Sequence, residues 1–330
     1  MPLISIIIAV YNNEKYVENA VRSVQKQDFD DYEIIIVDDG STDNTPMIVD
    51  EEARKDSRIK VIHQTNQWIY ASFNNGVRAA QGEYIYILNS DDKLADGALK
   101  KICKTLVDNN YPDVIYTKVS WCDCDDNQNI ISKSDLNPSI KENQYIDFRK
   151  EPTKWVHILE SEIIMNQANL YKRELALLHP FRTDIFGADY LFNLELARDI
   201  QTAVVLSDEI YLFHYYGNGE MNASVGKYYG YEHDMYNEFY EKVEHLMREK
   251  GIYSDSNMER IKLFRRNDLR KEVRALLRID KSNSIDEKIK IIRNNFWDET
   301  MAKCFSLKGK KGFDEVVDSE INKFLSQNNE

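Results

Sequence analysis

The sequence predicts an α/β fold whose sheet is mostly parallel and flanked by helices, followed by a helical C-terminal extension. Over residues 1–120, apolar runs that suit buried strands alternate with segments whose apolar residues recur at helical spacing. The strand runs lack polar alternation, which is typical of parallel strands covered on both faces. After about residue 228 the chain becomes charged, and its apolar residues recur at helical spacing.

The expected strands in the first part are ISIIIAV, YEIIIVDD, IKVIHQ and GEYIYIL. The helix expected within EKYVENAVRSVQKQ has one apolar face, made of Val17, Ala20, Val21 and Val24. A second helix is expected in NTPMIVDEEARK, with Thr45 as its N-cap and Pro46 at the first helical position. YASFNNGVRAAQG predicts a third helix, which ends before the last of these strands.

Later segments have mixed periodicity. DVIYTKV and TAVVLSDEIYLFHYY are expected to be strands, and GADYLFNLELARD a helix. Beyond these segments, two helical stripes are expected, formed by Met235, Phe239, Val243 and Leu246 and by Leu269, Val273, Leu276 and Leu277. We therefore expect one domain over residues 1–225, with halves 1–112 and 113–225, and a helical region over 226–330.

Composition limits the class of protein. The chain has 330 residues, of which 42% are hydrophobic, so it can bury a large core. Its apolar runs fall short of the roughly 18 residues that a membrane span requires, and its start does not resemble a signal peptide. Four cysteines form no disulfide or zinc pattern. A formal charge of −13 argues against nucleic-acid binding, and a cytoplasmic protein is expected.

Polar clusters follow three of the predicted strands, at Tyr11–Asn13, Asp38–Ser41 and Asn89–Asp92. Ligands of such sheets bind at the carboxyl ends of strands, so these clusters are expected to meet in one crevice. The first turn, AVYNNEKY, contains no glycine, which excludes the glycine-rich loops of dinucleotide and P-loop sites. A divalent cation held by carboxylates such as Asp91 and Asp92 is another way to counter the charge of a diphosphate.

Four blocks together resemble the family 2 glycosyltransferases with a GT-A fold, over about residues 1–215. They are ISIIIAVYNNEKYVENAVRSVQKQ, YEIIIVDDGSTDNT, NNGVRAAQGEYIYILNSDD and GADYLFNLELA. The tract NQWIYASFNNGVRAAQGEYIYILNSDD is most similar to the colanic-acid-type branch, which carries GIYDAMNKGI before FLNSGD. The resemblance implies a Rossmann-like sheet, a nucleotide-binding half over 1–112 and an acceptor half over 113–225.

The resemblance implies a donor site for a UDP-sugar. Tyr11 would stack on the base, Asp39 would accept a hydrogen bond from a base N–H, and Asp38 would lie near the ribose. Other implied donor-site residues are Ala9, Asn66, Asn74, Asn89, Ser90 and Asp91. The alternatives are ordinary packing for Tyr11 and a helix-capping loop for DDGSTD, with Asp43 and Thr45 as cap residues.

The resemblance also implies a metal ion, Mn²⁺ or Mg²⁺, bound by Asp91, Asp92 and His214. Because adjacent residues of an extended chain point to opposite sides, only one of the two aspartates is expected to face the ion directly. Asn89 occupies the first position of the metal motif, as is common in the colanic-acid-type branch. The alternatives are a solvated acidic turn for the aspartates and a structural role for His214.

Asp189 is the implied catalytic base of an inverting, in-line transfer to an acceptor hydroxyl. Its alternative is an acid in the first turn of a helix, favoured by the helix dipole. Trp155, Asn166 and Gln167 correspond to the acceptor region of the family, although Trp155 could equally be a core residue. Family members often have Glu where Ala188 stands, and many have Arg where Phe73 stands.

The function expected from this resemblance is transfer of one sugar from a UDP-sugar to a lipid-linked glycan. The expected pathway is bacterial surface-polysaccharide synthesis. The basic stretch 258–279 would contact the inner face of the plasma membrane, or would pack on the catalytic domain or a homodimer partner. A nucleotidyltransferase of the same fold would need a basic, glycine-rich first loop to bind a triphosphate. AVYNNEKY contains no glycine, which argues against that function. A catalytically inactive GT-A domain that serves as a binding module remains open, because of Phe73, Asn89 and Ala188.

Overall fold

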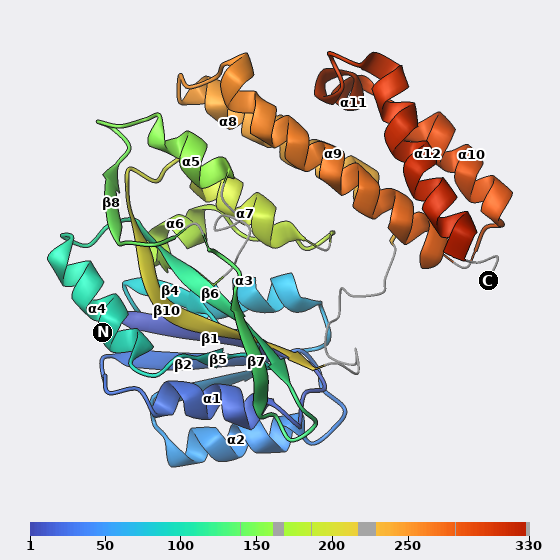
Figure 1. Cartoon of the computed structure of the whole chain (residues 1–330). Coiled ribbons are helices and arrows are strands. Elements are labelled where there is room, and N and C mark those ends of the chain that lie inside the picture. Colours follow the sequence, from blue (N-terminus) through green and yellow to red (C-terminus); the bar gives the residue numbers. More distant parts are fainter. Residues whose placement is uncertain (139, 161–167, 186, 217–228, 281, 328–330) are drawn as a thin grey trace. The chain divides into compact units, whose positions relative to one another are not determined.

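The computed structural model describes residues 1–138, 140–160, 168–185, 187–216, 229–280 and 282–327 (Figure 1). The predicted residues Asn166 and Gln167 lie outside these ranges. The chain divides into two compact units, Met1–Met221 and Asn222–Glu330, each considered separately below.

The first unit is built on a mixed sheet whose described strands run in the order β3-β2-β1-β4-β9-β6-β10-β5, with β7 beside β6 and β8 beside β10. The strands are β1 (Ile4–Val10), β2 (Tyr32–Asp38), β3 (Ile59–His63), β4 (Tyr84–Ile87), β5 (Lys93–Leu94), β6 (Val114–Cys124), β7 (Ile130–Asp135), β8 (Gln144–Asp147), β9 (Leu170–Lys172) and β10 (Thr202–Tyr216). Its helices are α1 (Val17–Gln25), α2 (Thr45–Lys55), α3 (Ile69–Ala79), α4 (Ala98–Asp108), α5 (Lys154–Glu160), α6 (Arg173–Leu178) and α7 (Ala188–Leu196).

The strands and helices expected over the first part of the chain are all present. One detail differs, because the N-cap of α2 is Asn44 and Thr45 is already helical. The Thr45 hydroxyl instead accepts a hydrogen bond from the Asn13 amide at 2.8 Å, and an Asp43 carboxylate oxygen accepts from the Thr45 amide at 2.9 Å. The sequence places the start of this helix correctly, but a contact distant in sequence decides what the threonine hydroxyl binds.

Strands β1 to β4 are parallel, as predicted. The register pairs Val10 of β1 with Asp38 of β2 and Ile7 with Ile87 of β4, so these strands end at one edge of the sheet. The other half is mixed: β6 and β10 are parallel, but the short β9 runs antiparallel between β4 and β6. The mixed periodicity of residues 113–216 did not reveal this reversal.

Both faces of β1 are buried because helices cover the sheet on each side of this strand. Ile6 and Ile8 belong to a core cluster with Val17 of α1 and Val49 of α2. Ile7 points to the other face, where a β-carbon on Gly76 of α3 would lie 2.4 Å from its Cγ2. This alternation explains why the strand is apolar throughout and why α3 needs a glycine at its closest approach to the sheet.

The second unit is helical. It contains α8 (Glu232–Glu249), α9 (Asp255–Arg278), α10 (Ile285–Asn295), α11 (Glu299–Cys304) and α12 (Gly309–Gln327). Helix α9 packs against each of the other four. The two predicted stripes face this core: Phe239, Val243 and Leu246 are buried on α8, and all four stripe residues of α9 are buried. No helix in the described part of the chain is long and apolar enough to span a bilayer.

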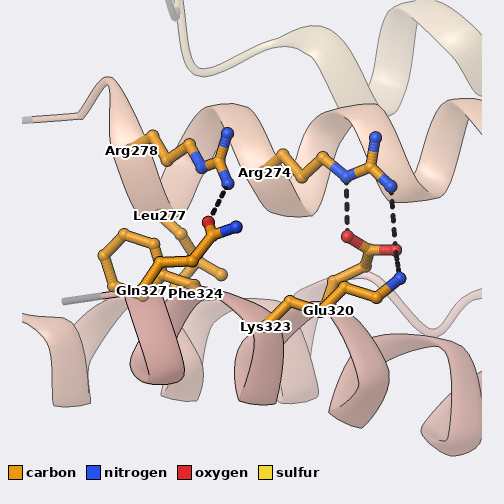
Figure 2. A pocket seen from close by; sticks show the side chains of 7 residues that line it. All are labelled: Arg274, Leu277, Arg278, Glu320, Lys323, Phe324 and Gln327. Atoms are coloured by element: carbon orange, nitrogen blue, oxygen red, sulfur yellow. Dashed lines mark hydrogen bonds and ion pairs between the residues drawn. The ribbon is translucent and has the colours of Figure 1, made fainter. Parts of the chain in front are cut away.

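The basic residues of α9 are largely paired within the second unit. Figure 2 shows Arg274 in a two-bond contact with Glu320 of α12, and Arg278 donating to the Gln327 side chain at 2.5 Å. These residues line a hollow of about 210 Å³ between the two helices. Lys262 and Lys271 pair with acids of α9 itself. Arg274 and Arg278 therefore pack within their own unit. A contact of this helix with a membrane, the catalytic domain or a dimer partner stays a prediction.

A buried charge network joins α8, α9 and the segment before α11. The Arg265 Nη1 atom lies 2.5 Å from Glu272 Oε1, and both residues are almost inaccessible to solvent. His233 places one ring nitrogen 2.7 Å from Glu272 and the other 2.9 Å from Asp298. Burial opposes a charge on the imidazole, but the bonds to Asp298 and Glu272 hold the pKa of His233 above its ordinary value. The protonated ring can donate to both carboxylates.

This network predicts that the second unit is less stable at alkaline pH. His233 contributes stability that is fully present below its unfolded pKa of about 6.5 and is lost as pH rises through the higher folded pKa. Replacing His233 with Gln should therefore lower the thermal unfolding midpoint most at about pH 6 and least at about pH 9. His245→Gln, at a histidine with a 67% exposed side chain, is the matched control and should show little such trend. A His233→Gln deficit independent of pH would contradict this assignment.

Candidate functional site

The turns that follow β1, β2 and β4 are hydrogen-bonded to one another, as the sequence predicts. The Asn12 amide donates to the Ser41 hydroxyl at 2.9 Å, and the Asn12 side chain accepts from the Thr42 amide at 2.7 Å. The Asn13 side-chain amide donates to the Ser90 hydroxyl at 2.6 Å. Asn12 adopts a left-handed backbone conformation, with φ of +48°. The three polar clusters therefore form one site at the edge of the sheet.

Asp39 is buried and its carboxylate organises the loop before α3. One oxygen, Oδ1, accepts from the Gln67 amide at 2.8 Å and from the Gln64 side chain at 2.7 Å. The other, Oδ2, accepts from the Trp68 amide at 2.8 Å. Since a carboxylate oxygen can accept about two hydrogen bonds, the described residues leave Oδ2 one acceptor position.

The residue before it, Asp38, is also buried and is tied to β3. Its carboxylate accepts from the Ser41 amide at 3.0 Å and lies 2.8 Å from His63 Nδ1. The hydrogen bond to Asp38 is the main reason that the pKa of His63 is raised. Asp38 therefore fixes the turn in which Asp39 stands, whether or not it also reaches a ribose.

The remaining predicted nucleotide residues differ in exposure. Tyr11 is 51% exposed directly after β1, which favours a binding role over core packing. Ala9 is buried within β1, and Asn66 is exposed in the loop before α3. The Val10 carbonyl accepts from the Asp39 amide at 2.9 Å, so Tyr11 lies one residue from a direct contact with Asp39.

Asp92 is buried in the turn after β4 and is surrounded by donors. Its oxygens accept from the Tyr211 hydroxyl at 2.5 Å, the His214 amide at 2.7 Å and the Asn89 side chain at 2.9 Å. Burial raises the pKa of Asp92 to about 6, against the opposing effect of these bonds. Both oxygens therefore already have protein partners, and Asn89 closes the turn by donating to this carboxylate.

Asp91 is partly exposed and precedes this buried aspartate. Burial of its carboxyl, together with the Asp92 charge, raises the pKa of Asp91 well above its ordinary value. The two aspartates therefore differ in their surroundings, with Asp92 directed into the protein by its hydrogen bonds. That Asp91 faces an ion stays a prediction.

His214 is buried on β10, next to this turn. Its Nδ1 lies 2.9 Å from the Leu212 carbonyl, which can only accept, so Nδ1 carries the proton and Nε2 presents a lone pair. Burial lowers the pKa of His214 to about 4, so the ring is neutral. Within the described residues, Nε2 is buried without a hydrogen-bond partner. A neutral imidazole held in this way is the form that binds metal ions.

The described part of the chain contains no group of three or more His, Cys, Asp or Glu side chains arranged to hold a metal ion. The residues present still fit an ion that takes most of its ligands from a substrate. In that part of the chain His214 Nε2 has no hydrogen-bond partner, and the Asp91 carboxylate is bonded only to its own backbone amide. Asp92, by contrast, is bonded through both oxygens.

Asp189 lies in the first turn of α7, after Gly187, which has φ of +88°. Its Oδ1 is 3.4 Å from the Tyr70 hydroxyl of α3, and the same hydroxyl accepts from the Gly187 amide at 2.9 Å. Burial raises the pKa of Asp189 to about 6, against the effect of nearby backbone amides and Tyr70. Helix α3 therefore connects two parts of the site. It begins at the loop that Asp39 holds, and its second residue, Tyr70, contacts Asp189.

An aromatic cluster supports this carboxylate. Phe73, at the position where many family members have Arg, is completely buried and lies 5.6 Å from the Phe181 ring, which stacks on Phe192 at 3.8 Å. The Asn74 side chain exchanges hydrogen bonds with the Phe181 backbone at 2.8 and 2.9 Å. Asn74 therefore positions the segment that leads to Asp189, and its contact with a nucleotide-sugar stays a prediction.

For Trp155 the structure favours the core alternative over an acceptor contact. The side chain is fully buried, and its ring stacks on Phe148 at 3.9 Å. Tyr70, Phe181 and Tyr211 were missed by sequence reasoning, although each binds a site residue. Tyr211 lies 119 residues from Asp92 in the chain, and no local pattern could indicate that contact.

The paired bonds of Asn74 predict a structural effect of its removal. Asn74→Ala leaves a buried N–H and C=O of Phe181 unpaired and should lower the free energy of unfolding by about 2 kcal/mol, measured by urea unfolding. The neighbouring Asn75 is partly exposed and donates to Gln64. Asn75→Ala is the control, and an equal loss in both variants would contradict the assigned role of Asn74.

Comparison with known proteins agrees with this geometry. Residues 5–168 match the family model described as Glycosyl transferase family 2. An uncharacterized glycosyltransferase of Haemophilus influenzae is 30% identical over 210 residues, which cover 63% of this chain and 77% of that protein. The GalNAc(5)-diNAcBac-PP-undecaprenol beta-1,3-glucosyltransferase of Campylobacter jejuni is 39% identical over 104 residues, which cover 31% of this chain and 34% of that enzyme.

Among solved structures, Staphylococcus aureus TarS 1–349 in complex with UDP-GlcNAc has a TM-score of 0.56 and 23% identity, covering 98% of this chain and 80% of that chain. At this identity the likeness concerns the fold alone, which is GT-A. The chain spans less than two thirds of the length of several curated relatives, including 61% of EpsJ of Bacillus subtilis. The family match, the Haemophilus relative and the shared fold together establish that the chain belongs to glycosyltransferase family 2.

Proposed function

We propose that this protein is an inverting, metal-dependent glycosyltransferase that moves one sugar from a UDP-sugar to a hydroxyl group of a glycan. The acceptor is proposed to be lipid-linked and the pathway to be bacterial surface-polysaccharide synthesis. The relative from Campylobacter jejuni, which is named for a PP-undecaprenol-linked substrate, and the TarS complex with UDP-GlcNAc support these choices of acceptor and donor.

One observation carries the proposal: the turns after β1, β2 and β4 are bonded into a single site that combines an exposed aromatic ring with carboxylates. Tyr11 offers a face for a base, and Asp39 Oδ2 keeps an acceptor position for a base N–H. Ser90 and Asp91 lie in the turn after β4, at the same edge of the sheet. With a divalent cation between its carboxylates and the phosphates, this combination suits a nucleoside diphosphate.

A divalent ion, Mn²⁺ or Mg²⁺, would be held by Asp91 and by His214 Nε2, and its charge would stabilise the departing diphosphate. Asp92 acts on this site from inside the protein, because its bonds to Tyr211 and the His214 amide fix the turn and β10 relative to each other. The predicted ligand role of Asp92 is thus replaced in this proposal by a positioning role.

Asp189 is proposed as the base that removes the proton from the acceptor hydroxyl as that oxygen attacks the anomeric carbon. Its carboxyl is held at the start of α7 by the Tyr70 hydroxyl, so its orientation is fixed by the helix that also carries the Asp39 loop. A carboxylate whose pKa is raised to about 6 is a stronger base than an ordinary one and is still ionised at neutral pH.

Nucleotide binding tests the donor site. Calorimetry with UDP, GDP, CDP and dTDP, with and without Mn²⁺, should show the tightest binding for UDP and only when the metal is present. Asp91→Asn should abolish the metal-dependent part of UDP binding because it removes the carboxylate that faces the ion.

Asp96→Asn is the matched control, since this exposed carboxylate follows the same turn at the protein surface. UDP binding that is equally strong without metal, or equally weakened by both substitutions, would reject the metal site. The absence of any nucleotide binding would instead favour the alternative that the domain is an inactive binding module.

Sugar transfer tests the base. Asp189→Asn should reduce kcat by about 10²–10⁴-fold while UDP affinity is retained. The kcat of the unaltered protein should fall as pH drops below about 6, because protonation of Asp189 removes the base. Asp184→Asn, in the same segment and with a 63% exposed side chain, should leave both properties unchanged. Full activity of Asp189→Asn would assign the base elsewhere.

The departures from the family pattern do not favour the inactive alternative. Phe73 and Ala188 are both completely buried, so each has a packing role in this fold. Asn89 supports the metal turn through its bond to Asp92. A contact of the basic helix α9 with a membrane stays a prediction from sequence, and its internal ion pairs supply no further support for it.

A further inference from the structure

Trp68 has a backbone conformation that residues other than glycine almost never adopt. With φ of 79° and ψ of 160°, it lies in a region of backbone space that is essentially confined to glycine. Its side chain is large and 38% exposed, so part of the indole ring is open to solvent. Strain of this kind persists only where the surroundings enforce it, and it concentrates at ligand sites.

The enforcing group is the buried carboxylate of Asp39. Asp39 Oδ2 accepts from the Trp68 amide at 2.8 Å, while the preceding amide of Gln67 is bound by Oδ1 at the same distance. The Trp68 carbonyl accepts from the Ser72 amide at 3.1 Å and begins α3. Relaxing the backbone at Trp68 would therefore remove a donor from a buried charge and unwind the first turn of the helix.

The same geometry places Trp68 beside the position that a nucleotide base would occupy. The acceptor position that the described residues leave on Asp39 belongs to Oδ2, the oxygen that already binds the Trp68 amide. Tyr11 approaches the same aspartate from β1, through the bond between the Val10 carbonyl and the Asp39 amide. Two exposed aromatic residues thus adjoin one carboxylate from separate segments of the chain.

We propose that Trp68 is a further binding residue of the donor site, and that its indole ring contacts the nucleoside part of a nucleoside diphosphate donor. This inference rests on the proposed function, because it assumes a nucleotide at Asp39. A glycine would satisfy the backbone without strain, so a strained tryptophan beside Asp39 points to a binding role for the exposed part of its ring. An aromatic ring offers a base a large, rigid face at little conformational cost.

The test separates the ring from the backbone. Trp68→Gly relieves the backbone strain, because glycine adopts this conformation freely. The same variant should bind UDP about tenfold more weakly by calorimetry, which is the effect typical of one contact between a base and an aromatic ring. Trp68→Phe keeps an aromatic face and should retain most of the affinity.

Fluorescence provides a second measurement. UDP should change the intrinsic tryptophan fluorescence of the unaltered protein, and this change should disappear in Trp68→Phe. Trp121→Phe is the control and should keep the change, since Trp121 is stacked between Phe213 and Tyr215 on the β6–β10 strands, with ring centroids 5.0 Å apart in each pair.

The outcomes are distinct. UDP affinity in Trp68→Gly equal to that of the unaltered protein overturns the proposal for Trp68 and leaves the proposed function intact. A fluorescence change that persists in Trp68→Phe also overturns it, even if Trp68→Gly destabilises the fold. If the unaltered protein binds no nucleotide, the proposed function fails and this inference fails with it.

Discussion

The buried carboxylate of Asp39 is the interaction on which the rest of the site depends. A charge removed from water must be compensated by hydrogen bonds, and Asp39 receives them from Gln64, Gln67 and Trp68. Those bonds fix the loop between β3 and α3, including the strained backbone at Trp68. The carboxylate that would recognise a base therefore also fixes the loop beside the proposed base position.

Helix α3 joins the Asp39 loop to the segment that contains Asp189. Its first turn is set by the Trp68 carbonyl, and Tyr70 then reaches Asp189 while Asn74 binds the Phe181 backbone. Gly76 allows the helix to lie against Ile7 of the central strand. One helix thus links the predicted nucleotide residues to the predicted base.

Much of the fold could be predicted from sequence because its signals are local. The continuous apolar strands, the helical spacing of Val17 to Val24 and the stripes of α8 and α9 each follow from burial of a single element. The short antiparallel β9 was not predicted, because three residues carry no recognisable period and the strand is paired only through β4 and β6. Likewise, the pairing of the basic residues on α9 with α12 depends on residues about 50 positions away.

The sequence by itself determined which residues are candidates for a nucleotide-sugar site, because its motifs resemble those of the family and place Tyr11, Asp39, Asp91 and Asp189 at predicted strand and helix ends. Only the tertiary structure decided how the acids differ. Asp92 is enclosed by Tyr211 and β10 while Asp91 remains partly exposed, and Trp155 became a core residue. The physical reason is that burial and hydrogen bonding depend on partners far away in sequence, whereas strand ends and helix starts are set by local propensity and periodicity.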